Sequence, residues 1–347
     1  MNTLTRREFL QIASIATASI ALADGVSSPR LKTRGVVLIP DDFSLSDWPE
    51  RAQRAGLTTI GLHHGRSIAE VEKFVRSEIG GQTLARARQL GLEIEYELHA
   101  MGDLLPRAMF EQDKTLFRMN EQGERVSDFN LCVHSPHALE IVSANALSIA
   151  QRLRPTTGRY FYWGDDARPW CRCPKCGPLS DSDQALLLEN ALVKALRSQD
   201  PRAQLSHLAY ATTIKPPEQI KPEPGIFLEY APIGRRYDIP YAQQIDSKDG
   251  LANLDSNLKV FPANTAQALE YWLDVSRFSG WKRPAKKLPW NRDVFLADLE
   301  TYAARGIRHI TTFAVFIDAD YLKLHGEPKA LQEYGDGLRG RQVNSRR

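Results

Sequence analysis

Short apolar runs alternate with longer segments of helical period along the chain from residue 34 onward. The run GVVLIP (35–40) is followed by SDWPERAQRAG, in which Ser46 or Asp47 fits a helix N-cap and Gly56 a helix stop. The run TTIGLHH (58–64) then precedes a stretch that predicts one long helix over 68–90. This alternation predicts strands connected by helices.

Residues 92–100 (LEIEYELHA) alternate strictly between apolar and polar side chains. The apolar phase begins at Leu92, and the polar phase contains Glu93, Glu95, Glu97 and His99. A period of two residues predicts a strand. We interpret Glu93 and Glu95 as polar filling of a barrel or as a solvated edge.

The second half of the chain repeats the pattern. Apolar runs at 159–166, 203–210, 225–233 and 307–317 predict strands, and 268–278 is ambiguous between helix and strand. About eight strand candidates, mostly separated by helices and without a series of hairpin turns, predict a (β/α)8 TIM-like barrel. No G-x-G-x-x-G follows the first strand, which argues against a doubly wound nucleotide-binding sheet.

The N-terminus departs from this pattern. Arg6 and Arg7 precede a mildly apolar stretch that closes on Ala21-Leu22-Ala23, an A-x-A cleavage pattern. These features predict a twin-arginine signal, recognised by the twin-arginine export machinery, and a periplasmic or secreted protein. We expect a signal peptide (1–23), a short leader (24–33) and a single barrel domain (34–340). The alternative is a basic amphipathic first helix.

Composition and charge narrow the classes of function. The 347 residues are 42% hydrophobic and 25% charged, with a formal net charge of +3, which is typical of a soluble globular enzyme. The charges are spread along the chain, so we predict neither nucleic-acid binding nor a membrane-binding face. No apolar run after residue 30 is long enough to span a bilayer, which predicts no membrane span in the mature protein.

The four cysteines form a candidate metal site. Cys132 stands alone, and Cys171, Cys173 and Cys176 make a C-x-C-x-x-C. Cys132 and Cys171 follow neighbouring predicted strands, so their loops should lie on one rim of the barrel. Four thiolates complete the tetrahedral shell of Zn²⁺ and leave no open position, which predicts a structural zinc. The alternatives are two disulfides, which export permits, and a redox-active Cys173–Cys176 pair.

Carboxylates at strand ends are the candidate catalytic groups, because active sites of such barrels lie at the carboxyl ends of the strands. Asp165 and Asp166 follow a strongly apolar strand, close in the sequence to Trp163 and Trp170, and Glu229 ends another strand. Glycoside cleavage needs one protonated and one ionised carboxyl group. We therefore predict glycan cleavage by these carboxylates. The structural alternative is that the aspartates cap a helix or form a turn.

Other side chains at strand ends are candidate substrate-binding residues. Aromatic faces are natural platforms for sugar rings, and histidines bind hydroxyl groups. The His63–His64 pair lacks a third ligand at motif spacing, so a core position or substrate contact is favoured over metal binding. The predicted substrate-binding residues are His63, His64, His99, Trp163, Trp170 and Tyr210.

Three stretches resemble a known family. They are YFYWGDDARPWCRCPKC (160–176), EYWLDVSRFSGWKRPAKKLPW (270–290) and DLETYAARGIRHITTFAVFIDADY (298–321). They are similar to the bacterial TIM-barrel domain family of formerly unknown function that includes the family-163 glycoside hydrolases, over roughly residues 90–335. Characterised members of family 163 are endo-acting N-acetylglucosaminidases on N-glycans. The resemblance thus implies a glycan substrate, with N-acetylhexosamine as a candidate sugar.

The resemblance also implies a retaining, substrate-assisted mechanism, in which the acetamido group of the sugar is the nucleophile. By analogy, Asp165 would orient that group and Asp166 would act as acid and base. Enzymes of that mechanism usually present an Asp-Glu pair, whereas this chain has Asp-Asp. This departure leaves Glu229 as an alternative proton donor. It also leaves open a non-catalytic carbohydrate-binding or scaffold protein on a degenerate barrel.

The cysteine spacing is similar to the structural zinc cluster of the family-42 β-galactosidases. In that family one cysteine precedes a C-x-C-x-x-C, as Cys132 precedes Cys171 here at a similar distance. This second resemblance implies zinc as the bound metal and again a barrel hydrolase.

Overall fold

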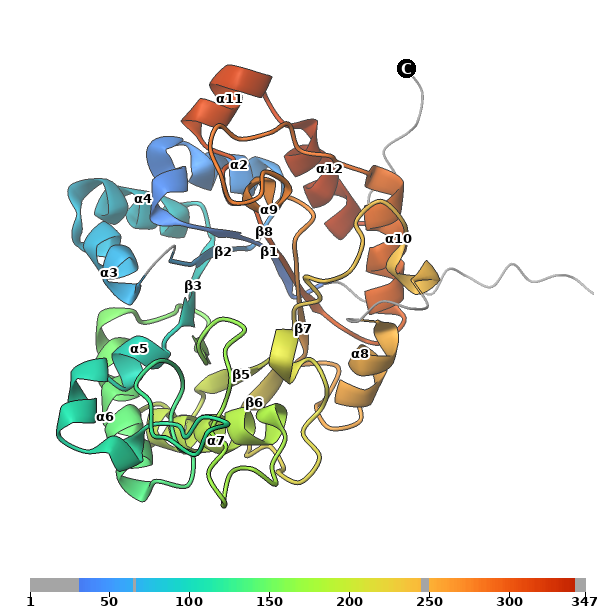
Figure 1. The fold of residues 1–347 in the computed structure, drawn as a ribbon. Coiled ribbons are helices and arrows are strands. Elements are labelled where there is room, and N and C mark those ends of the chain that lie inside the picture. The colour runs from blue at the N-terminus through green and yellow to red at the C-terminus, as the bar shows by residue number, and fades with distance from the viewer. Residues whose placement is uncertain (1–30, 65–66, 245–249, 341–347) are drawn as a thin grey trace, which may run out of the picture. The chain divides into compact units, whose positions relative to one another are not determined.

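The computed structural model describes residues 31–64, 67–244 and 250–340 (Figure 1). The predicted signal peptide and the first part of the predicted leader lie outside the described residues. Within the described ranges, no helix has the length and apolar character needed to cross a membrane.

Eight parallel strands follow one another around a closed barrel (Figure 1). β8 pairs back onto β1, with Thr33 opposite His309, which closes the ring. This arrangement confirms the predicted (β/α)8 TIM-like barrel. The strands are β1 (Thr33–Leu38), β2 (Thr59–Leu62), β3 (Glu93–His99), β4 (Arg159–Trp163), β5 (Gln204–Ala209), β6 (Ile226–Tyr230), β7 (Gln267–Glu270) and β8 (His309–Phe313).

Helices surround the strands on the outside of the barrel (Figure 1). The α-helices are α2 (Trp48–Arg54), α3 (Ile68–Arg76), α4 (Glu78–Gln89), α5 (Met101–Leu104), α6 (Pro136–Arg152), α7 (Asp181–Gln199), α8 (Leu251–Asn257), α9 (Val275–Phe278), α10 (Arg292–Ala303), α11 (Ala319–His325) and α12 (Lys329–Leu338). Short 3-10 helices are η1 (Pro40–Ser44), η2 (Arg107–Glu111), η3 (Lys114–Leu116), η4 (Ala211–Thr213) and η5 (Tyr241–Gln243).

Two segments differ from the sequence-based expectation. The single helix expected over 68–90 is two helices, α3 and α4, separated at Ser77. Ser77 has an extended backbone, and its hydroxyl oxygen accepts a hydrogen bond from the Gly80 N–H (3.0 Å), which caps α4. The ambiguous segment 268–278 contains both kinds of element, because β7 ends at Glu270 and α9 begins at Val275.

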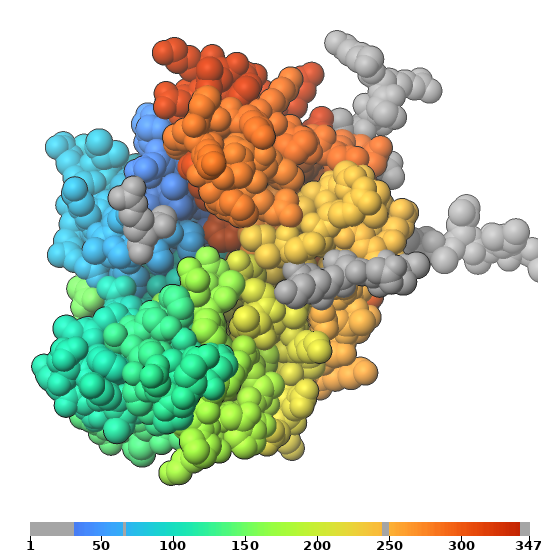
Figure 2. All heavy atoms as spheres, viewed as in Figure 1, coloured from blue at the N-terminus to red at the C-terminus, as the bar shows by residue number. Residues whose placement is uncertain are grey.

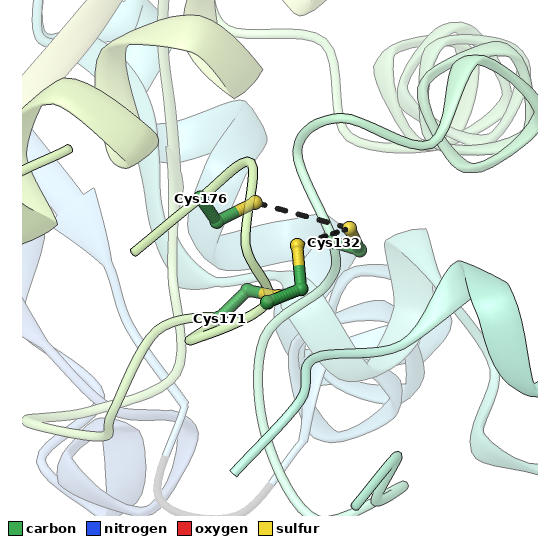
Figure 3. A group of neighbouring side chains, drawn as sticks. Cys132, Cys171 and Cys176 are labelled. Carbon is green, nitrogen blue, oxygen red and sulfur yellow. Dashed lines mark hydrogen bonds between the residues drawn. The ribbon is translucent and has the colours of Figure 1, made fainter. Parts of the chain in front are cut away.

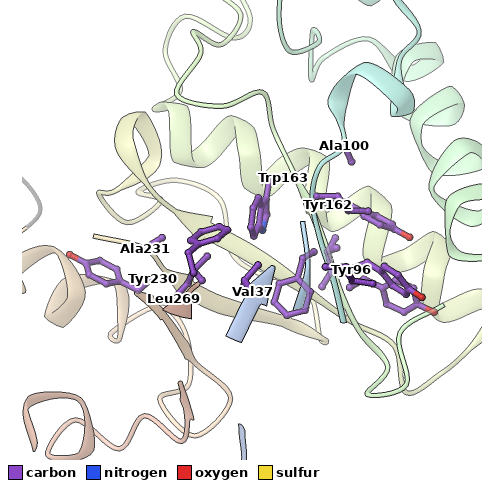
Figure 4. Close-up of a cluster of buried hydrophobic side chains, with 14 of the residues drawn as sticks. Val37, Tyr96, Ala100, Tyr162, Trp163, Tyr230, Ala231 and Leu269 are labelled. Atoms are coloured by element: carbon purple, nitrogen blue, oxygen red, sulfur yellow. The ribbon is translucent and has the colours of Figure 1, made fainter. Parts of the chain in front are cut away.

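The buried core has an apolar part and a polar part. Figure 4 shows part of the apolar cluster, with Val37, Tyr96, Ala100, Tyr162, Trp163, Tyr230, Ala231 and Leu269 labelled. Glu95 and Glu97 of β3 are fully buried, whereas Glu93 is exposed. Burial, followed by the charges of Glu229 and Glu95, raises the pKa of Glu97 well above its ordinary value. The buried glutamates of β3 are therefore polar filling of the barrel and not a solvated edge.

Candidate active site

One open cavity of about 310 Å3 lies at the carboxyl ends of the strands, where active sites of such barrels are found. Its lining comes from residues that end or follow strands in both halves of the chain. Figure 2 shows a hollow in the middle of this face, between segments coloured blue, green and orange. The lining combines three histidines, two aspartates and a wall of aromatic and aliphatic side chains.

The three histidines are held by main-chain carbonyl groups. His63 Nδ1 lies 2.6 Å from the carbonyl oxygen of Glu97, and His99 Nδ1 lies 2.8 Å from that of Gly164. Because a carbonyl oxygen only accepts, these contacts place the ring proton on Nδ1 and leave Nε2 as an acceptor. His64 Nε2 lies 3.3 Å from the carbonyl oxygen of His99.

Burial keeps these imidazoles uncharged. Burial, followed by the neighbouring His64 and His99, lowers the pKa of His63 well below its ordinary value. Burial and then His99 lower the pKa of His64 to about 4, and burial also lowers the pKa of His99. A neutral imidazole has a ring nitrogen that can accept a hydrogen bond from a hydroxyl group of a ligand. The predicted substrate-binding histidines thus lie together on one cavity wall.

These shifts predict that the protein loses stability in acid. An unfolded chain protonates His64 near its ordinary pKa of 6.5, whereas the folded protein resists protonation until about pH 4. The free energy of unfolding is therefore undiminished above pH 6.5 and falls as the pH drops toward 4, by roughly 3 kcal/mol for His64 alone. Urea unfolding of the parent and of His64→Gln across this range measures the difference. Equal losses in both proteins would contradict the prediction.

Asp165 and Asp166 have different environments. The Asp165 carboxylate accepts hydrogen bonds from Arg107 Nη2 (2.7 Å) and from the Asn130 N–H (2.6 Å), and it does not line the 310 Å3 cavity. It ties the long β3–α6 connection to the end of β4. Asp166 lines the cavity with a side chain that is 63% exposed, and its Oδ1 lies 3.9 Å from His99 Nε2.

Glu229 is fully buried and does not line the cavity. Its Oε2 accepts a hydrogen bond from Trp163 Nε1 (2.8 Å), and its Oε1 accepts one from Gln267 Nε2 (3.2 Å). Burial raises the pKa of Glu229 to about 8. Glu229 contacts the site only indirectly, by its hydrogen bond to the indole of Trp163, which lines the cavity.

Of the three predicted aromatic substrate-binding residues, two line the cavity and one does not. Trp163 and Tyr210 line the cavity. Trp170 is buried and does not line the cavity; it packs against the loop that follows β4. A Cβ atom at Gly164 would lie 2.9 Å from Trp170 Cζ2 and 3.0 Å from Asn130 Oδ1. Only a glycine fits there without a shift of its neighbours.

The substitution Gly164→Ala is therefore expected to displace the loop that carries both aspartates and to lower the free energy of unfolding by about 1–3 kcal/mol. Denaturant unfolding measures the loss. Gly102→Ala is the matched control, because nothing lies within 4 Å of a Cβ placed at Gly102. Equal stability of the two variants would contradict the expected close packing.

Asp274 follows a strand candidate in the sequence but is not among the predicted catalytic residues, and the structure places it in the cavity wall. Asp274 follows β7, and its Oδ1 accepts hydrogen bonds from the Ser276 hydroxyl (2.5 Å) and the Arg277 N–H (3.2 Å). Burial outweighs these bonds and raises the pKa of Asp274. Its position after a strand candidate is visible in the sequence, but the ambiguity of 268–278 between helix and strand gave no reason to choose it over the other acids at strand ends.

Further aromatic rings complete the cavity wall. Tyr271 and Phe313 stack with ring centroids 5.3 Å apart, and Trp281 lines the cavity with 66% of its surface exposed. Phe316 also lines the cavity and has a left-handed backbone (φ 72°). Its N–H donates to the buried Asp42 carboxylate (2.9 Å), which holds this strained conformation.

The four cysteines lie together, and Figure 3 shows three of them, Cys132, Cys171 and Cys176. Cys132 Sγ is 3.8 Å from both Cys173 Sγ and Cys176 Sγ, and all four sulfurs lie within 4.8 Å of one another. An S–S bond would be about 2.05 Å long, and all four thiols are free. Sulfurs at the corners of a tetrahedron with Zn–S bonds of ~2.3 Å would be about 3.8 Å apart. The cluster therefore fits a tetrahedral metal site.

Donor groups surround the sulfurs. The Met119 N–H donates to Cys171 Sγ (3.3 Å), and the Arg125 guanidinium lies 3.7 Å from the same sulfur. His134 Nδ1 lies 3.2 Å from Cys176 Sγ. Such donors stabilise negative charge on thiolates that hold a metal. The cluster also joins the β3–α6 connection to the β4–α7 loop, which carries Asp166.

The sequence matches one family and no curated protein. The profile of a family described as a domain of unknown function (DUF4838) matches residues 26–323. None of the curated proteins matches significantly.

Several solved structures with a similar fold are described as glycoside hydrolases. A β-N-acetylhexosaminidase from Bacteroides fragilis NCTC 9343 has a TM-score of 0.57 at 11% identity, over 92% of this chain and 68% of that one. A β-galactosidase from Rahnella sp. R3 has a TM-score of 0.55 at 14% identity, over 89% and 56%. Gan42B, a family-42 β-galactosidase from G. stearothermophilus, has a TM-score of 0.53 at 13% identity, over 89% and 56%.

At these identities the likeness is one of fold. The chain spans little more than half the length of the two galactosidases. The protein thus shares the barrel fold of these structures and carries a cluster of four buried cysteines that fits a metal ion.

Proposed function

The chain belongs to the DUF4838 family, and on that premise we propose that it is a glycoside hydrolase that cleaves a glycan in the cavity at the carboxyl end of its barrel. One observation carries this proposal. The cavity brings two carboxyl groups, three uncharged histidines and several aromatic rings around one space of ligand size. The likeness in fold to glycoside hydrolases supports it.

Asp166 and Asp274 supply the two carboxyl groups that glycoside cleavage requires. Within the described part of the chain they are the only acids that line this cavity. Asp166 keeps the role of acid and base that the sequence suggested. Asp274 takes the place of Asp165, whose carboxylate is occupied by Arg107 and Asn130. Glu229 supports Trp163 instead of donating the proton.

An N-acetylhexosamine remains the candidate sugar, with a retaining, substrate-assisted mechanism. In that mechanism the acetamido oxygen attacks the anomeric carbon while Asp166 protonates the leaving oxygen. Asp274, in its ionised form, accepts the acetamido N–H and orients the group for attack. The aromatic wall that includes Trp163 and Tyr271 offers apolar contact to the acetamido methyl group. The likeness to a β-N-acetylhexosaminidase supports this choice.

We further propose that the cysteine cluster binds one structural Zn²⁺. The S···S separations of 3.8 Å match a tetrathiolate site, which has no position left for substrate. When bound, the metal would hold together the β3–α6 connection and the β4–α7 loop, which carries Asp166. The four thiolates would bind the metal, and nearby N–H donors such as that of Met119 would stabilise their negative charge.

We also propose that residues 1–23 direct export by the twin-arginine machinery to the periplasm or beyond, followed by a short leader (24–33) and one catalytic domain (34–340). The family match begins at residue 26, just after the predicted cleavage site. Fractionation of cells that express the full chain tests this. A periplasmic product that begins near Asp24 is expected, and retention after Arg6→Lys/Arg7→Lys would confirm the route.

The function is tested with a panel of 4-nitrophenyl β-glycosides (N-acetylglucosamine, N-acetylgalactosamine and galactose) and a set of glycans, with products read by mass spectrometry. Cleavage by the parent, lost in a folded Asp166→Asn/Asp274→Asn variant, is the expected result. Cleavage by both proteins would place the chemistry elsewhere. Binding without cleavage by the parent would replace the hydrolase with the carbohydrate-binding alternative.

A further inference from the structure

A second cavity, of about 550 Å3, adjoins the first. The two share part of their lining, namely His63, His64, His99 and Asp166. Because they have this wall in common, the two cavities are neighbouring chambers of one cleft. Each reaches the size of ~300 Å3 at which ligand pockets begin.

The two chambers differ in chemistry. The first is mostly aromatic and aliphatic, and we call it the aromatic chamber. The second, which we call the polar chamber, is lined beyond the shared wall by Ser67, Gly102, Asp103, Phe129, Asp165 and Arg168. Its single aromatic ring contrasts with the ring-rich wall of the first. A ligand that fills both must therefore present an apolar face at one end and polar groups at the other.

Arg168 is the cation of the polar chamber. Its guanidinium carbon lies 4.6 Å from the ring centroid of Phe129, a contact that holds the planar group in place. Asp165, which lies close by, pairs with Arg107 instead, and Arg168 forms no ion pair with any residue that the structure describes. A stacked guanidinium still has N–H donors at its edge, and these suit pairs of oxygen atoms.

We propose that the two chambers bind two adjacent sugar units of one oligosaccharide, and that Arg168 binds oxygen atoms of the sugar in the polar chamber. This proposal rests on the proposed function and narrows its substrate class. The substrate is an oligosaccharide that is recognised on both sides of the cleaved bond, not a terminal sugar on an arbitrary partner.

The placement of the two aspartates agrees with this reading. Asp274 lines only the aromatic chamber, so the sugar that is attacked lies there. Asp166 lines both chambers, so it lies where the bond between the two sugars passes. A proton donor must reach that bridging oxygen, and Asp166 has the required position.

The test compares Arg168→Ala with Arg202→Ala, a control whose side chain is 90% exposed, before β5. Each protein is assayed on an oligosaccharide and on the 4-nitrophenyl glycoside of its first sugar. For Arg168→Ala, KM for the oligosaccharide is expected to rise about tenfold more than KM for the 4-nitrophenyl glycoside. Equal changes for both substrates, or none, would overturn the proposal.

Two further arms separate the possible outcomes. In the first, neutral and uronic-acid oligosaccharides are compared as substrates of Arg168→Ala. A larger rise of KM with the uronic acid identifies a carboxylate as the group bound by Arg168, whereas equal rises identify hydroxyl groups.

In the second, binding of a thio-linked, uncleavable oligosaccharide is measured by calorimetry. If the parent cleaves nothing, the hydrolase proposal fails. A tenfold weaker binding by Arg168→Ala would still support the two chambers, and unchanged binding would overturn them.

Discussion

The substitution Asp274→Asn is expected to lower kcat for glycan cleavage by about 10²–10⁴-fold, because the amide cannot carry the negative charge that orients and stabilises the reacting group. The asparagine is nearly the same size and keeps an oxygen for the Ser276 hydroxyl and the Arg277 N–H. KM and the free energy of unfolding should therefore change little. Saturation kinetics together with urea unfolding separate these effects.

Asp293→Asn is the matched control, since this aspartate is 94% exposed on α10. Its kcat should equal that of the parent. An Asp274→Asn variant with the kcat of the parent would remove Asp274 from the chemistry and leave the site with Asp166 alone.

The pH profile offers an independent check on Asp274. Burial raises its pKa, so its ionised form is lost at a higher pH than for an ordinary aspartate as the solution is acidified. Activity should fall on the acid side accordingly. Ser276→Ala removes a hydrogen bond that lowers this pKa, so the acid limb of kcat/KM should move to still higher pH. A limb that does not move would show that another group titrates.

Loss of the metal site should have the largest effect on stability. The substitution Cys176→Ser, or removal of zinc by a chelator, is expected to lower the free energy of unfolding by about 3–5 kcal/mol. This is less than the ~10–16 kcal/mol of zinc-finger peptides, because the barrel folds around the loops that the metal joins. Metal analysis should find one zinc ion per chain, and chelator saturated with zinc is the control.

Cys176→Ser and removal of zinc should also reduce activity, although the metal takes no part in the reaction. Asp166 stands on the loop whose cysteines join Cys132, so a loosened loop misplaces the proton donor. Reloading with cadmium, which also prefers thiolates, should restore stability and activity together. A chain that contains no metal and has unchanged stability after Cys176→Ser would contradict the zinc proposal.

The barrel could be predicted from sequence because its strands are apolar runs of a recognisable length, separated by helical periods. β3 was the clearest, since Ile94, Tyr96 and Leu98 alternate with glutamates in the sequence. The break between α3 and α4 could not be predicted, because the apolar period of the two helices runs on through Ser77. Its hydroxyl cap is visible only in three dimensions.

The site could be predicted only in part. Three histidines, Trp163 and Tyr210 end strands of a barrel, and this topology brings them to one cavity. Neighbouring side chains point in different directions, however, so the sequence could not separate Asp166, in the cavity, from Asp165, beside it. Asp274 was not selected among the acids at strand ends, because β7 has only four residues, too few to show a period.

The pairing of β1 with β8 also sets how the chain must fold. Thr33 and His309 are partners across nearly the whole described sequence, so the first strand gains its second neighbour only after almost all of the chain is made. Closure of such a long loop is slow compared with local helix formation. Until then, the open edges of β1 and of β7 can pair with another chain. A ribosome-bound chain that stops before β8 is thus an incomplete cylinder, whose two free edges need protection from aggregation.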